Sequence, residues 1–231
     1  MGVAENLNEV LSEIRLAERN AGREESSVRL IAVSKTKSAD LIREAYDAGQ
    51  RDFGENYVQE ILSKAPLLPS DIRWHMIGHL QRNKVRQIID KVSMIHSVDS
   101  LKLAQEISKE AVKKGIVMPV LIEVNIGEEE SKSGAAPEET VALAEEITGL
   151  PGISLKGLMC VPPVCSEPSE SERYFDRLRE LNIDIKDRKI DNGSVCELSM
   201  GMSHDFPEAI KCGATMVRVG TRIFGERDYS R

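Results

Sequence analysis

The residues RLIAVSKTKSAD, at positions 29–40, decide the fold. Leu30–Val33 form a short uninterrupted apolar run, which is typical of a strand buried on both faces of a parallel sheet. Ser38 then precedes a helical pattern of apolar residues and is a favourable helix N-cap. The stretch therefore predicts a buried strand, a loop that carries Lys35 and Lys37, and a helix.

The same order of apolar run, polar turn and helical pattern recurs along the chain. Eight runs predict strands, at Leu30–Ser34, Arg51–Gly54, Arg73–Gly78, Met94–Val98, Val120–Asn125, Leu155–Met159, Cys196–Ser199 and Thr215–Val219. Helical patterns follow Ser38, Ser100, Pro137 and Phe206, and another is lined by Tyr174, Leu178 and Leu181. Strands that alternate with helices indicate parallel β-α-β units.

Eight such units in 231 residues predict one (β/α)₈ TIM barrel over residues 1–231, with a helix over residues 1–21 packed on it. The alternative is a doubly wound sheet of five or six strands. That alternative is weakened because the glycine fingerprint of dinucleotide-binding sheets does not follow the first strand.

Composition excludes several classes of protein. The net charge of −7 argues against a general nucleic-acid binder, and no apolar run reaches the length that a membrane span needs. The first twenty residues have helical spacing and acidic side chains rather than the features of a signal peptide, so a cytoplasmic protein is expected. Four cysteines without a C-x-x-C pair are expected to be structural thiols.

Polar residues gather where the predicted strands end, which is the catalytic face of this type of barrel. These positions are Lys35, Lys37, Glu55, Asn56, His79, Gln81, Arg82, Asn83, Asn125, Lys132, Ser199, Ser203, Arg218, Gly220 and Thr221. His75 and His79 lack a neighbouring carboxylate in the sequence, so no metal site is expected.

Two of these segments predict an anion site. Ser203 is expected to cap a helix over His204–Ile210, whose first amides would attract a phosphate. Gly220 allows a ligand to approach the backbone, and Thr221 adds a hydroxyl. Loops after the seventh and eighth strands are the usual phosphate position in this fold. Ordinary turn chemistry would place the same residue types there.

Lys35 is the candidate reactive residue. A lysine that is partly desolvated at a strand end can attack an aldehyde and form a Schiff base. Together with a phosphate site, this chemistry suits pyridoxal 5′-phosphate (PLP) or a sugar-phosphate aldolase. The aldolase also needs a carboxylate in the barrel mouth, for which Glu55 and Glu123 are the candidates. A lysine at this position could equally be a solvated loop residue.

Seven motifs resemble one known family, from residue 29 to the end of the chain. They are IAVSKTK, FGENYVQE, WHMIGHLQRNK, SKSG, GLMC, LSMGMSHDF and MVRVGTRIFGER. The sequence is similar to the PLP homeostasis protein family, also called the proline synthetase co-transcribed family. The resemblance implies a barrel like the N-terminal domain of alanine racemase, which is PLP fold type III.

The resemblance also implies roles for individual residues. Lys35 would hold PLP as a Schiff base, and Arg218 would face the pyridine nitrogen. The segments with Ser199, Ser203, Gly220 and Thr221 would hold the phosphate, while Asn56, His79 and Met200 would lie near the ring. Lys37 and Lys132 would be mouth lysines that relay the cofactor.

Two functions remain from this comparison. The family implies a carrier that stores, protects or delivers PLP, with PLP-dependent apo-enzymes as recipients. The alternative is an amino-acid racemase with weak activity. Barrel racemases take an opposite-face tyrosine from a second domain, whereas here the chain ends soon after the eighth strand, and Tyr229 lies too near the terminus. The expectation is therefore a monomeric carrier, and light scattering would test the monomer.

Overall fold

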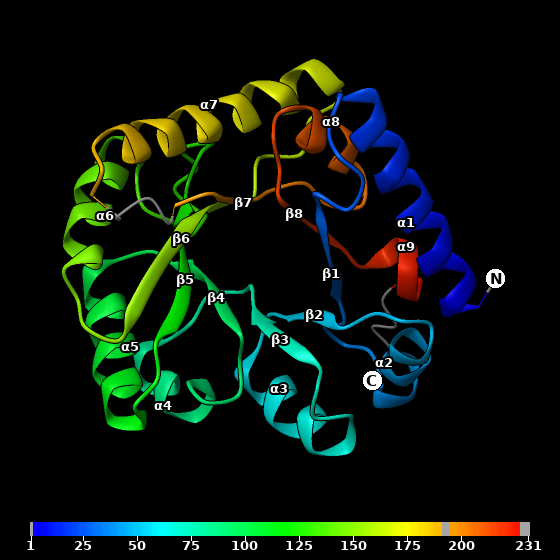
Figure 1. The fold of residues 1–231 in the computed structure, drawn as a ribbon, viewed down its shortest axis with the longest axis horizontal. Coiled ribbons are helices and arrows are strands. Elements are labelled where there is room, and N and C mark those ends of the chain that lie inside the picture. Colours follow the sequence, from blue (N-terminus) through cyan, green and yellow to red (C-terminus); the bar gives the residue numbers. More distant parts are fainter. Residues whose placement is uncertain (1, 191–194, 227–231) are drawn as a thin grey trace.

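The computed structural model describes residues 2–190 and 195–226 and shows a closed barrel of eight parallel strands inside a ring of helices (Figure 1). The strands are β1 (Arg29–Val33), β2 (Asp52–Glu55), β3 (Arg73–Met76), β4 (Met94–Val98), β5 (Met118–Val124), β6 (Ile153–Cys160), β7 (Glu197–Ser199) and β8 (Met216–Val219). Each strand pairs with the next, and β8 closes the barrel on β1, where Ile31 lies opposite Arg218. The predicted (β/α)₈ barrel is confirmed.

Helices connect the strands on the outside of the barrel. They are α1 (Val3–Asn20), α2 (Ala39–Asp47), α3 (Val58–Lys64), α4 (Val85–Ile88), α5 (Leu101–Lys114), α6 (Thr140–Thr148), α7 (Pro168–Asp187), α8 (Phe206–Lys211) and α9 (Thr221–Phe224), with 3₁₀ turns at Ala65–Leu67, Arg82–Lys84 and Pro137–Glu139. The sequence did not predict α3, α4 or α9, because one or two helical turns show too little periodicity. In residues 2–190 and 195–226, no helix combines the length and apolar character needed to cross a membrane.

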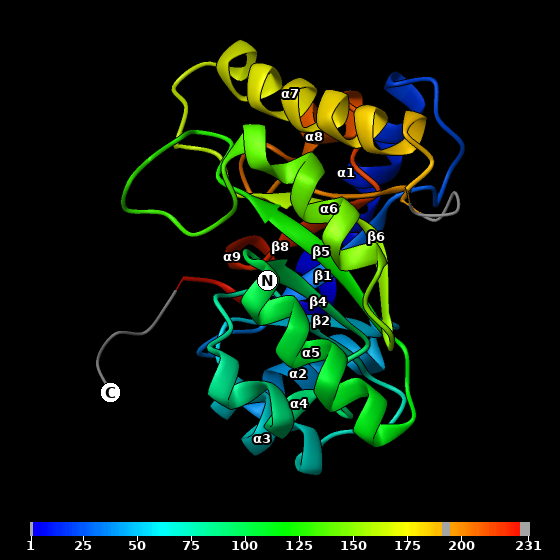
Figure 2. The same cartoon turned by 90° about the vertical axis from the view of Figure 1, so that its left-hand side faces the viewer.

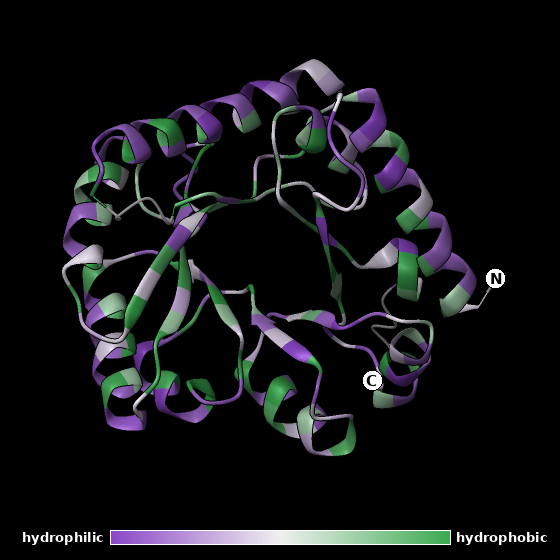
Figure 3. Ribbon diagram, viewed as in Figure 1, coloured by the Kyte–Doolittle hydropathy of each residue, from purple (hydrophilic) through white to green (hydrophobic). Residues whose placement is uncertain are grey.

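Local sequence explains where the longer helices begin and end. Ser38 precedes α2, and its hydroxyl accepts a hydrogen bond from the Leu41 amide at 3.4 Å. Gly115 ends α5 in the left-handed conformation, with φ 65°, directly after Lys113 and Lys114. The outer helices carry hydrophobic and hydrophilic residues in alternation along their length, as expected of helices with one face on the barrel (Figure 3).

The first helix, α1, lies along the outside of the barrel beside α8 and α9 (Figures 1 and 2). The Asn6 side chain donates a hydrogen bond to the Ile223 carbonyl at 3.0 Å, and Arg222 pairs with Glu13. The helix buries Leu7 and Val10 against this surface. It therefore covers the side of the barrel where β8 closes on β1.

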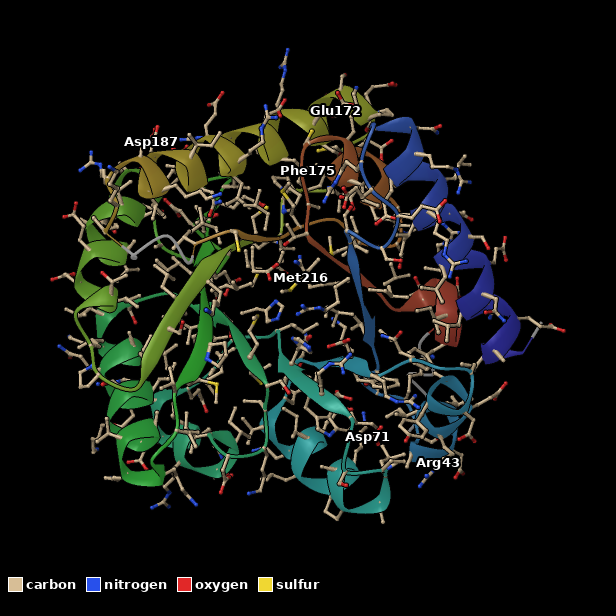
Figure 4. The ribbon with its side chains drawn as sticks, in the orientation of Figure 1. Arg43, Asp71, Glu172, Phe175, Asp187 and Met216 are labelled. Carbon is tan, nitrogen blue, oxygen red and sulfur yellow. The ribbon has the colours of Figure 1, made fainter. Side chains whose placement is uncertain are left out.

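The interior of the barrel has an apolar layer and a polar layer. A cluster of five buried side chains fills the apolar layer: Ile31, Met94, Leu121, Met159 and Met216. Met216 lies in the middle of the barrel (Figure 4). Side chains two residues further along a strand point to the same side, so the next layer toward the strand ends consists of Val33, His96, Glu123, Val161 and Arg218. Three residues of this second layer, Val33, Val161 and Arg218, also line the cavity described below.

Candidate functional site

A cavity of about 350 Å³ opens at the carboxyl ends of the strands. It is lined by Val33, Lys35, Lys37, Asn56, Ile77, Val161, Met202, Ser203, His204, Arg218, Gly220, Thr221 and Gly225. These residues come from the ends of β1, β2, β3, β6, β7 and β8 and from the loops that follow them. The volume lies in the range of small-molecule sites, and apolar walls with a few polar groups are their usual lining.

Nine residues were expected to hold or face the cofactor, and the structure brings six of them into this cavity: Lys35, Asn56, Ser203, Arg218, Gly220 and Thr221. Lys35 lies in the turn directly after β1 and is partly buried. Asn56 follows β2, the neighbouring strand. The chain separates these residues widely, so the barrel topology alone gathers them.

One side of the cavity carries a compact polar group of three residues, Ser203, Gly220 and Thr221, called the Ser203 group below. The Gly220 amide donates to the Ser203 hydroxyl at 3.4 Å, and the hydroxyls of Thr221 and Ser203 lie 3.1 Å apart. A Cβ atom at Gly220 would lie 3.1 Å from the Val33 carbonyl oxygen. The close packing of Gly220 on Val33 leaves little room for a side chain. Amide and hydroxyl groups of the kind gathered here are donors that suit a phosphate.

The predicted capping role of Ser203 is wrong. The helix begins at Phe206 rather than His204, and Asp205 occupies the N-cap position. The Asp205 carboxylate accepts from the Met202 amide at 2.6 Å, which folds the loop back before the helix starts. Ser203 is thereby directed toward Gly220 across the cavity instead of toward the helix.

Arg218 forms part of the cavity wall although its side chain is almost completely buried. Its guanidinium donates to the Ser199 hydroxyl at 2.8 Å and to the Cys160 carbonyl at 2.8 Å. Burial lowers the pKa of Arg218 from its usual value, and the nearby carboxyls Asp205 and Glu123 oppose that effect. A guanidinium keeps its charge in such surroundings. The cavity therefore contains a fixed positive group.

The other three of the nine expected cofactor residues lie outside this cavity. Ser199 is fully buried and accepts a hydrogen bond from Arg218, which does line the cavity. Met200 is packed in the main hydrophobic core, with its amide bonded to the Met216 carbonyl at 3.1 Å. His79 is exposed, faces a neighbouring cavity that shares Asn56, and lies 3.3 Å from Asp99.

The two predicted mouth lysines have different surroundings. Lys37 lines the cavity, and its amine donates to the Gly225 and Glu226 carbonyls at 3.0 and 2.6 Å. It ties the segment after α9 to the loop after β1. Lys132 is exposed in the loop after β5 and does not line the cavity.

Two further polar features lie among the strand ends: an ion pair that the sequence did not predict, and Glu123, which it named only as a carboxylate for an aldolase. Lys64 on α3 makes a buried ion pair with Glu55, and it was missed because α3 itself was not predicted. Glu123, on β5, has one buried carboxylate oxygen without a hydrogen-bond partner. Burial, reinforced by Asp99, raises the pKa of Glu123 to about 7. In residues 2–190 and 195–226, no cluster of three or more His, Cys, Asp or Glu side chains could hold a metal ion.

These groups fit a phosphorylated aldehyde that carries a basic ring nitrogen. The Lys35 amine can react with an aldehyde, the Ser203 group supplies phosphate donors, and Arg218 offers N–H groups to a ring nitrogen. All three open into the same cavity.

Comparison with known proteins identifies the family. The model of the alanine racemase N-terminal domain family matches residues 6–228. A PLP homeostasis protein of Aquifex aeolicus is 46% identical over 230 residues, covering 99% of this chain and 100% of the relative. The chain belongs to the PLP homeostasis protein family. Another member, from Pseudomonas aeruginosa, is 47% identical over 98% of this chain and 96% of the relative's sequence.

A similar solved structure has the same fold. PipY of Synechococcus elongatus PCC7942, whose structure has PLP bound, superposes with a TM-score of 0.84 at 36% identity. The alignment covers 96% of this chain and 100% of PipY. The resemblance to the family that the sequence motifs indicated is thus confirmed over the whole barrel.

Proposed function

We propose that this protein binds PLP and serves in its homeostasis, by storing, protecting or delivering the cofactor. The observation that carries the proposal is the convergence of Lys35, Arg218 and the Ser203 group on one cavity. The relatives named as PLP homeostasis proteins and the PLP-bound PipY structure support it.

Each group has a distinct task in this proposal. The Lys35 amine bonds to the aldehyde carbon with loss of one water, which makes a reversible Schiff base. Ser203, Gly220 and Thr221 hold the phosphate, and Arg218 lies beside the pyridine nitrogen. PLP supplies an aldehyde and a pyridine ring that withdraws electrons. A charged guanidinium has no readily released proton, so Arg218 leaves the ring nitrogen unprotonated. The unprotonated ring withdraws electrons less strongly.

This arrangement favours a carrier over an enzyme. A reversible bond to Lys35 masks a reactive aldehyde, and the open cavity allows transfer to PLP-dependent apo-enzymes. Asn56 contributes a polar group to the cavity wall, while Lys37 holds one edge of the mouth. His79 and Lys132, at the surface outside the cavity, would act during uptake or release of the cofactor rather than in holding it.

The test is a comparison of the wild type with Lys35→Ala and with Lys113→Ala, an exposed lysine of α5. PLP is added, free cofactor is removed, and borohydride reduction is followed by peptide mass spectrometry. The proposal expects a reduced adduct on Lys35 in the wild type and in Lys113→Ala, with none in Lys35→Ala. No adduct in any protein would refute it.

A second arm of the experiment separates the carrier from a racemase. L-alanine is incubated with the PLP-loaded wild type, and the two enantiomers are quantified. Retained chirality supports the carrier. Racemisation that disappears in Lys35→Ala would make the protein an enzyme.

A further inference from the structure

An unbroken line of hydrogen-bonded side chains crosses the inside of the barrel. Arg218 Nη1 lies 2.8 Å from Ser199 Oγ, which lies 2.9 Å from His96 Nδ1. His96 Nε2 lies 2.9 Å from His75 Nδ1, and His75 Nε2 lies 3.0 Å from Asp52 Oδ1. All five residues are buried. The line joins the cavity at the carboxyl ends of the strands to the first residue of β2 at their amino ends.

The outer end of this line is anchored at the surface. Arg73, the first residue of β3, donates two hydrogen bonds to the Asp52 carboxylate at 2.8 and 2.6 Å. Burial raises the pKa of Asp52, but the hydrogen bonds from Arg73 and His75 outweigh it and hold the pKa well below its ordinary value. Asp52 is therefore a carboxylate and can only accept hydrogen bonds.

The inner end of the line is a fixed donor. A guanidinium has no acceptor atom, so Arg218 donates to the Ser199 oxygen. The Ser199 hydroxyl can then donate a hydrogen bond to His96 Nδ1, which is the acceptor. Whether the donors and acceptors are assigned from Arg218 or from Asp52, each hydrogen bond between them has the same donor and the same acceptor.

Burial keeps both imidazoles neutral. It lowers the pKa of His75, with Asp52 opposing, and lowers that of His96 well below its usual value, with His75 adding to the effect. A neutral imidazole has one donor and one acceptor nitrogen. His75 must donate from Nε2 to Asp52 and so accepts at Nδ1, and His96 must donate from Nε2 to His75 and so accepts at Nδ1.

We propose that His75 and His96 are held in the Nε2–H tautomer and that, with Ser199, they are positioning residues that fix the Arg218 guanidinium at the cavity. Every hydrogen bond in the line points from Arg218 toward Asp52. The positive end of the line lies at the cavity and the negative end at the opposite face of the barrel. The part of this inference that concerns bound PLP rests on the proposed function.

The direction of the line is tested in the cofactor-free protein. Long-range ¹H–¹⁵N correlations of the imidazoles, assigned with His75→Gln and His96→Gln, distinguish the two tautomers. We expect a protonated Nε2 and an unprotonated Nδ1 in both rings through the neutral pH range. If the glutamine variants do not fold, Ser199→Ala assigns His96 through its displaced Nδ1 signal. A protonated Nδ1 in either ring overturns the proposal.

The positioning role is tested by Ser199→Ala against Ser97→Ala. Ser97 is also buried and lies next to His96 on β4, but its hydroxyl donates to the Gly78 carbonyl and is not in the line. Ser199→Ala leaves one donor of Arg218 and the acceptor of His96 unpaired. We expect the dissociation constant of PLP to rise about tenfold, and the absorbance band of bound PLP to shift.

The Ser97→Ala control and the wild type distinguish a failure of the positioning role from a failure of PLP binding. Ser97→Ala should keep the wild-type band, affinity and imidazole signals. If Ser199→Ala behaves like Ser97→Ala, Ser199 does not position Arg218 and the positioning role is overturned. If the wild type itself fails to retain PLP, the proposed function fails, and the imidazole signals alone then decide the direction of the line.

Discussion

Lys64 Nζ lies 2.8 Å from Glu55 Oε1, and both side chains are buried beneath the loop that follows β1. The same ammonium donates to the Ser34 carbonyl at 2.9 Å, and the Ser34 hydroxyl donates to Glu55 Oε1 at 2.7 Å. Burial raises the pKa of Glu55 to about 7, and Lys64 opposes the shift. The ion pair therefore fixes the backbone of Ser34, the residue before Lys35.

A second carboxylate extends this support to the turn itself. Glu60 accepts from Lys64 at 2.9 Å and from the Thr36 amide at 2.6 Å. Thr36 has φ 64°, a left-handed conformation that is unfavourable for a β-branched residue. The contacts from α3 hold this conformation, which directs Lys35 into the cavity.

Replacing Lys64 with methionine should destabilise the protein by about 3 kcal/mol, because it leaves Glu55 buried without its cation. Urea unfolding measures the change. Adding Glu55→Gln to this variant removes the uncompensated charge and should restore part of the loss.

A surface lysine provides the control for this prediction. Lys109 pairs with Glu106 on α5, and its side chain is 56% exposed. Lys109→Met should change the free energy of unfolding by less than about 0.5 kcal/mol. Equal effects at Lys64 and Lys109 would show that the buried pair adds nothing.

Glu123 predicts a pH dependence of stability. Its pKa is raised to about 7 in the folded protein from an ordinary value of 4.5. The folded state therefore binds a proton more tightly than the unfolded state, so the contribution is present below pH 4.5 and is lost as the pH rises through 7. Glu123→Gln should remove a decline of up to about 3 kcal/mol over this interval.

Urea unfolding of both proteins across the interval measures this decline. The wild type should lose stability relative to Glu123→Gln as the pH rises. Curves that stay parallel would mean that Glu123 is ionised at its ordinary pKa.

The sequence predicted the parts of the molecule that depend on periodicity. An apolar run such as Leu30–Val33, in which Leu30, Ile31 and Ala32 are buried, is recognisable without its neighbours. The barrel order then brings the residues at strand ends together, so Lys35, Asn56 and Arg218 could be grouped before their geometry was known.

The parts that the sequence did not predict depend on three-dimensional packing. The Ser203 error arose because Asp205, two residues later, is an equally good N-cap, and backbone geometry decides between them. Lys64 lies on α3, which the sequence did not predict, and its partner Glu55 lies on a different element. The line through His75 and His96 likewise appears only when the barrel closes.

Gly78 should affect the cavity although it does not line it. A Cβ atom there would lie 2.5 Å from the Asn56 carbonyl oxygen and 2.7 Å from its Cα, so Gly78→Ala must displace the backbone of Asn56. We expect a loss of about 2 kcal/mol of stability and a weaker affinity for PLP, measured by fluorescence titration.

Gly115→Ala is the matched control. Gly115 has φ 65° at the end of α5, with open space where a Cβ atom would lie, and its replacement should cost about 1 kcal/mol. The affinity for PLP should not change. A Gly78→Ala protein with wild-type affinity would show that Asn56 has no part in binding.

Ser203→Ala tests which part of the ligand the Ser203 group holds. Ser203 joins Gly220 and Thr221 through its hydroxyl, so its loss removes a donor from the phosphate position and the partner of the Gly220 amide. The dissociation constant of PLP should rise about tenfold, whereas that of pyridoxal, which lacks the phosphate, should stay the same. Ser12→Ala, an exposed hydroxyl on α1, should affect neither ligand. An equal loss for PLP and pyridoxal would place Ser203 at the ring or the aldehyde instead, and the phosphate would then have to be held elsewhere in the cavity.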